Sequence, residues 1–94
     1  MIHVTKLILD VLKPHQPNAL DFSRTLAAVG ADYRVQLVVV EVDEHTETLR
    51  VLIEGGDLDF IAIEQAITTM GASLHSIDEV DVRNITASSS SDAC

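Results

Sequence analysis

The chain repeats one structural plan, and this repeat limits its fold more than any other feature. Two segments with apolar residues at helical spacing, 17–29 and 58–70, each end at a glycine just before a strand-like segment. Strands are predicted over residues 3–12, 33–43, 48–54 and 73–82. Asp57 is the predicted N-cap of the second helix, and Gly30 is the predicted left-handed residue that ends the first. The order is strand, helix, strand, strand, helix, strand.

Right-handed crossovers turn this order into one α+β architecture. We predict a ferredoxin-like βαββαβ sandwich with an antiparallel sheet in the order 4-1-3-2 and two helices on one face. In the first strand, Leu7, Leu9 and Val11 share one face and should lie under the helices. The opposite, open face is predicted to be bare and apolar, and we expect the chain to self-associate across this face or along the edge strands. Its apolar members are Ile8, Leu12, Val38, Val40, Val42 and Leu52.

Length and composition indicate one small domain. The chain has 94 residues, of which 47% are hydrophobic, enough for one core but not for two. We expect a single ferredoxin-like domain over residues 1–84 and a disordered, Ser-rich C-terminal tail over residues 85–94. No apolar run reaches membrane-spanning length, and the first residues do not resemble a signal peptide. We therefore expect a cytoplasmic protein.

The charge balance argues against some partners. The chain has fifteen acidic and six basic residues, and its formal net charge is −9. Such a surface repels nucleic acids and anionic membranes, so neither is an expected partner. At molar ionic strength, the screening length of salt is roughly 3 Å, so the acidic side chains repel one another only at short range. We therefore expect a halophilic source; an ordinary acidic protein is the alternative.

A candidate metal site combines the first and last strands, which should be neighbours in the sheet. Asp10, His75, Asp78 and Glu79 form this set. Oxygen-rich clusters bind calcium or magnesium, and imidazole would also admit a transition metal. Alternation puts Asp78 and Glu79 on opposite faces unless a bulge intervenes. The alternative is that Asp10 forms an ordinary ion pair and His75 is a packed histidine.

A second candidate site lies in the turn after the first strand, where Lys13 and His15 could bind an anionic ligand. These two residues are expected near Asp10, Asp43, His45 and His75, at one edge of the sheet.

Other functions known for this fold need residues that the chain does not have at the required positions. The only cysteine is Cys94, and the first and third predicted strands carry no aromatic residue on which a base could stack.

Two stretches resemble signature segments of a small archaeal family, domain of unknown function 211: LDVLKPH (residues 9–15) and LHSIDEV (residues 74–80). Weaker similarities are EVD (41–43), TE (46–47) and EGGDLDF (54–60). The resemblance covers residues 6–82. It implies a ferredoxin-like fold and a ring-like homo-oligomer with bound divalent cations, and it implies no established activity. The acidity, the Val-rich second strand and the Ser-rich tail depart from the family.

The leading functional hypothesis is a non-enzymatic, homo-oligomeric binding module with a regulatory role. It would take a divalent cation or a small metabolite near Asp10, His75 and Asp78 or Glu79, at contacts between subunits. One alternative is a small enzyme that uses Lys13, His15 and His75 as acid–base groups on an anionic substrate. Another is a purely structural assembly without a ligand.

Overall fold

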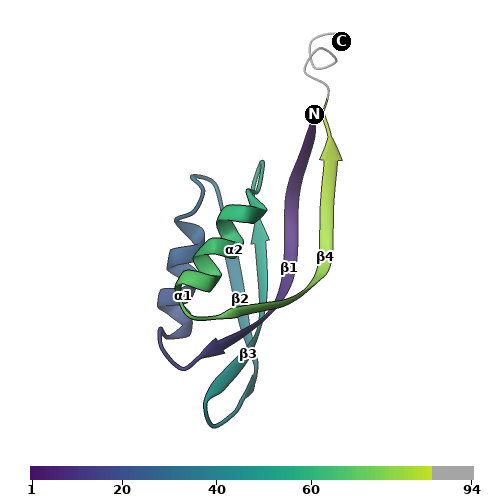
Figure 1. Ribbon diagram of the computed structural model, residues 1–94. Coiled ribbons are helices and arrows are strands. Elements are labelled where there is room, and N and C mark those ends of the chain that lie inside the picture. Colours follow the sequence, from purple (N-terminus) through teal and green to yellow (C-terminus); the bar gives the residue numbers. More distant parts are fainter. Residues whose placement is uncertain (86–94) are drawn as a thin grey trace.

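The computed structural model describes residues 1–85 and has the predicted fold (Figure 1). The elements follow in the order β1 (Ile2–Pro14), α1 (Ala19–Ala27), β2 (Arg34–Val42), β3 (Thr46–Glu54), α2 (Phe60–Thr69) and β4 (Ser73–Asn84). The antiparallel sheet has the order β2-β3-β1-β4, which is the predicted 4-1-3-2 order seen from the other edge. Both helices lie on one face of the sheet. The predicted tail over residues 86–94 lies outside the described residues.

The core lies between the helices and the two central strands. Side chains at alternate positions of β1 and β3 point toward the helices, and they are almost completely buried. They are Leu7, Leu9 and Val11 on β1 and Leu49, Val51 and Ile53 on β3. Phe22 and Leu26 of α1 and Ile63 and Ile67 of α2 complete this layer. Each such side chain contributes about 1.5–3 kcal/mol of transfer free energy, so this layer holds the helices on the sheet.

The second helix begins two residues later than predicted. Asp59, rather than Asp57, is its N-cap, and the Asp59 carboxylate accepts the backbone N–H of Ala62 at 3.0 Å. Leu58 belongs to the preceding loop, because its side chain is buried and its N–H donates to the carbonyl of Val4 at 2.8 Å. The prediction of Asp57 as N-cap was therefore wrong, since a tertiary contact of Leu58 sets the boundary.

Gly30 has a different role from the predicted left-handed stop. Helix α1 ends with Ala28 as its C-cap, and the glycine with positive φ is Gly71, at 84°. A Cβ on Gly30 would lie 2.1 Å from Cε1 of Tyr33, so this position needs glycine to admit the tyrosine ring. The Tyr33 hydroxyl accepts the N–H of Asp59 at 2.7 Å and thereby joins the residue before β2 to the N-cap of α2.

The open face of the sheet is less apolar than predicted. Ile8, Leu12 and Leu52 lie there half-buried, among charged neighbours. One cross-strand row carries alternating charges: Arg34, Glu54, Lys6 and Asp81. Val42 is opposite Glu47 and so lies on the helix side, because Val40 is an extra residue that shifts the alternation of β2.

Much of the exposed apolar surface lies along the two edge strands. On β2 it comprises Val38, Val39, Val40 and Val42, which are 41–62% exposed. On β4 it comprises Ile77, Val80 and Val82, which are 45–50% exposed because the helices do not extend over this part of the sheet (Figure 1).

Candidate functional site

The pairing of β1 with β4 is irregular, and this irregularity arranges the acidic side chains. The register shifts three times. Asp10 is opposite Ser76 while Val11 is opposite Leu74, so His75 is an extra residue on β4. In the same way, Asp78 is extra between Ile77 and Glu79. Each extra residue resets the alternation of β4, which is how a bulge redirects side chains.

An acidic patch on the open face results from these bulges; we define it as Asp10, Ser76, Asp78 and Glu79. Ser76 shares the open face with its cross-strand partner Asp10, and its hydroxyl donates to Asp78 at 2.7 Å. Glu79 is opposite Ile8 on the same face. Three of the four predicted metal ligands are therefore on one side of the sheet.

The charges around the acidic patch are partly compensated. Lys6 Nζ lies 2.9 Å from Glu79 Oε2, and this contact raises the pKa of Lys6, mainly through the hydrogen bond. Asp10 is opposite Arg50 on its other side. His75, the fourth predicted ligand, is exposed. Within residues 1–85 of a single chain, no three His, Cys, Asp or Glu side chains are placed to hold a metal ion together. The metal site stays a prediction.

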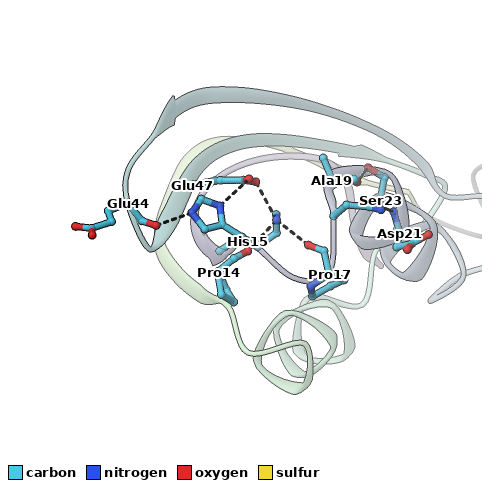
Figure 2. Close-up of polar contacts among 10 residues, drawn as sticks. Pro14, His15, Pro17, Ala19, Asp21, Ser23, Glu44 and Glu47 are labelled. Atoms are coloured by element: carbon cyan, nitrogen blue, oxygen red, sulfur yellow. Dashed lines mark hydrogen bonds and ion pairs between the residues drawn. The ribbon is translucent and has the colours of Figure 1, made fainter.

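A polar corner built around a buried lysine lies on the opposite side of the sheet (Figure 2). We call Lys13, His15 and Glu47 the Lys13 corner. Lys13 occupies the next helix-facing position after Val11 and is completely buried. Its ammonium contacts Glu47 Oε1 at 2.9 Å and donates to the carbonyls of Pro17 at 2.7 Å and Pro14 at 2.9 Å. An ammonium has three N–H donors, and here all three have a partner.

His15 connects the turn after β1 to the β2–β3 hairpin. Its Nδ1 lies 3.2 Å from Glu47 Oε2, and its Nε2 lies 2.9 Å from the carbonyl oxygen of Glu44. Both ring nitrogens thus face acceptors, which favours the doubly protonated imidazolium. The pKa of His15 is raised, first by the hydrogen bond to Glu47 and then by the bond to the Glu44 carbonyl. The pKa of Glu47 is lowered, first by Lys13 and then by His15.

The charged residues that were predicted to gather at one edge lie on two different faces of the sheet. Asp10 lies on the open face, whereas Lys13 lies on the helix side. His45 is exposed in the hairpin, 3.9 Å from Glu44. Lys13 and His15 do come together, as predicted, although they meet around an acid that was not singled out. Their assignment as a ligand-binding pair stays a prediction.

Glu47 is the residue that the sequence argument missed. It shares the buried face of β3 with Leu49, Val51 and Ile53, and it is directly opposite Lys13. A carboxylate on an otherwise apolar strand face is a detectable signal, because such a group needs a partner. The signal was lost because the third strand was predicted to begin at residue 48, whereas β3 begins at Thr46.

The fold and these two charged regions define the class: a ferredoxin-like α+β domain with an acidic open face. None of the helices within residues 1–85 is long and apolar enough to span a membrane.

Comparison with known proteins is more specific. Residues 5–88 match domain of unknown function 211, a family described as "Uncharacterized ArCR". The chain is also similar to the uncharacterized protein MJ0319 of Methanocaldococcus jannaschii, with 40% identity over 77 residues. This alignment covers 82% of the chain and 79% of the relative. The chain therefore belongs to the domain of unknown function 211 family, as its two signature stretches predicted.

Proposed function

We propose that this protein is a homo-oligomeric, regulatory binding module that takes a divalent cation, calcium or magnesium, on the acidic patch where subunits meet. The observation that carries the proposal is the pair of bulges at His75 and Asp78. Without them, strict alternation would send Asp78 and Glu79 to opposite faces. With them, Asp78 bonds to the serine opposite Asp10, and Glu79 follows on the same face.

The number of available ligands supports a site shared between chains. Calcium takes 6–8 oxygen ligands, and magnesium takes six, several of which are water molecules. One chain offers three carboxylates on this patch, and Glu79 is already paired with Lys6. Ligands from a second chain would raise this number. A bound cation would also offset part of the formal charge of −9 that each subunit carries.

The Lys13 corner gives less support to an enzyme acting on an anionic substrate. Every N–H donor of Lys13 bonds within the chain, and the side chain is completely buried. His75 lies on β4, which β1 separates from the hairpin that His15 contacts. A buried ammonium with all its donors in use is typical of a structural ion pair rather than of a substrate site.

The first experiment measures native mass by light scattering in molar KCl, with and without EDTA, together with calorimetric titration of calcium and magnesium. We expect a defined oligomer that binds a divalent cation. Asp10→Asn should weaken binding by roughly tenfold or more, because it removes one anionic ligand. It should leave the fold intact, since Asp10 is not part of the core.

Asp21→Asn is the matched control, because it makes the same chemical change at an exposed position on α1. It should leave cation affinity unchanged. Equal affinities for the wild type and Asp10→Asn would contradict the acidic patch as the site. A monomer under all conditions would contradict the shared site. An oligomer that binds neither cation would leave small metabolites, or no ligand, as the explanation.

A further inference from the structure

The two edge strands of the sheet differ in how well they are protected against pairing with another chain. An exposed edge presents unpaired N–H and C=O groups, and natural proteins protect it with charges and bulges. Strand β4 has both, since it carries Asp78, Glu79, Asp81 and Arg83 and two extra residues. Strand β2 has no charged residue between Arg34 and Glu41; that interval reads Val-Gln-Leu-Val-Val-Val. The less protected edge of this sheet is therefore β2, which has one bulge and carries charges only near its two ends.

The single bulge of β2 gives this edge a symmetric charge pattern. Arg34 and Glu41 are seven positions apart, an odd separation that would put them on opposite faces of a regular strand. Because Val40 is the extra residue, Glu41 is opposite Thr48 and returns to the open face, where Arg34 also lies. With Val40 set aside, Arg34 and Glu41 are each three places from Leu37. One is basic and the other is acidic.

We infer that β2 pairs with β2 of a second copy of this chain, antiparallel and around a two-fold axis at Leu37. This deepens the proposed function, on which it rests, by naming one contact of the homo-oligomer. In this register Arg34 of each chain is opposite Glu41 of the other, Val35 is opposite Val39, and Gln36 is opposite Val38. Each pair shares a face of the sheet, as cross-strand neighbours must. The contact is isologous, because the same patch serves both chains.

The surroundings of these side chains fit the inference. Val38 and Val39 are 46% and 41% exposed in the single chain, so pairing would remove apolar surface from water. Among the ion pairs within residues 1–85, none involves Glu41. Arg34 contacts Glu54 at 2.9 Å, and its guanidinium, with five donors, can serve a second carboxylate at the same time. The dimer joins both sheets into one continuous sheet.

A charge-swap experiment tests this register. Arg34→Glu places Glu opposite Glu41 twice in a dimer, and Glu41→Arg places Arg opposite Arg34 twice. Each variant alone should therefore associate at least about tenfold more weakly than the wild type. In a mixture of the two variants, both cross-strand pairs become attractive again, so the mixture should form a one-to-one heterodimer. Native mass spectrometry of the separate and mixed full-length chains, at about 0.15 M salt, measures this.

Two variants control for the change of charge alone. Arg83→Glu makes the same change as Arg34→Glu on the other edge strand, and Glu64→Arg makes the same change as Glu41→Arg on α2. Both should keep the wild-type mass. Circular dichroism confirms that every variant is folded.

The outcomes separate this inference from the proposed function. Loss of association in each single variant, with recovery on mixing, supports the β2 pairing. An oligomer that neither swap changes overturns the β2 pairing and leaves the homo-oligomer in place. Dissociation of both single variants without recovery on mixing also overturns the Leu37 register. A monomeric wild type overturns both the pairing and the homo-oligomeric function.

Discussion

The Lys13 corner and the acidic patch lie on opposite sides of the same sheet, and they use charge in opposite ways. In the corner, a completely buried ammonium is held by three acceptors from two segments. In the patch, the carboxylates of the exposed Asp78 and Glu79 have one partner each, and the half-buried Asp10 has only a charged cross-strand neighbour. The comparison teaches that a buried charge with all its bonds made is committed to the fold, because removing one partner is costly, whereas incompletely paired charges nearer the solvent stay available to a ligand. The following predictions test this division.

The largest effect is expected from Glu47→Ala. This change leaves the Lys13 ammonium buried beside two neutral carbonyls, and removing one partner of a buried ion pair costs about 3–5 kcal/mol. Urea unfolding followed by far-UV circular dichroism measures the loss. Glu64→Ala, on the exposed side of α2, is the control and should change stability by less than about 0.5 kcal/mol.

A double variant sharpens this prediction. Lys13→Met combined with Glu47→Leu removes both charges and keeps similar volume, so it should recover most of the stability that Glu47→Ala loses. If Glu47→Ala unfolds at the same urea concentration as the wild type, the corner is not a structural ion pair. The comparison between the two regions would then have no basis.

The next effect is a pH dependence that arises from His15. The pKa of His15 is raised in the folded chain, so its contacts contribute fully at a pH below the ordinary histidine value of about 6.5. This contribution is lost as the pH rises through the raised pKa. Glu47 acts in the opposite sense, because its lowered pKa adds stability that is lost as the pH falls through that pKa.

The measurement is urea unfolding of the wild type and His15→Ala across about pH 5 to 9. The wild type should lose stability on the alkaline side of histidine titration, and His15→Ala should show a flatter profile there. The groups that act on His15 are the Glu47 carboxylate and the backbone of Glu44 and Asp43, and Glu47 also binds Lys13. His45 is an exposed histidine of the same hairpin, so His45→Ala serves as the control and should keep the wild-type slope. Identical profiles for the wild type and His15→Ala would contradict this role of His15.

The smallest effect on stability is expected from Lys6→Gln on the acidic patch. The Lys6–Glu79 pair is exposed, and such pairs contribute little to folding. The same change should strengthen calcium or magnesium binding, since it removes the ammonium that competes for Glu79. Calorimetric titration measures this, and the direction is opposite to that expected for Asp10→Asn. Weaker cation binding in Lys6→Gln would contradict the role of Glu79 as a ligand.

The fold followed from the sequence because periodicity and turn residues agree along the chain. Leu7, Leu9 and Val11 alternate as a half-covered strand requires, and two helical stripes follow the same plan. The sites were harder to predict because they depend on bulges. One extra residue reverses the face of every later side chain, and nothing local in the sequence marks Val40, His75 or Asp78 as extra. The Lys13 corner was also missed in part because the predicted third strand began at residue 48, which left Glu47 outside β3.

The position of Tyr33 has a practical consequence for spectroscopy. It is the only tyrosine of the chain, and the chain has no tryptophan, so near-ultraviolet emission from the protein reports on this one ring. The ring lies against Gly30, and its hydroxyl accepts the N–H of Asp59, so its signal follows the contact between the start of β2 and the N-cap of α2. Because Tyr33 belongs to neither charged region, its emission can follow the unfolding of variants in both regions, without an added label.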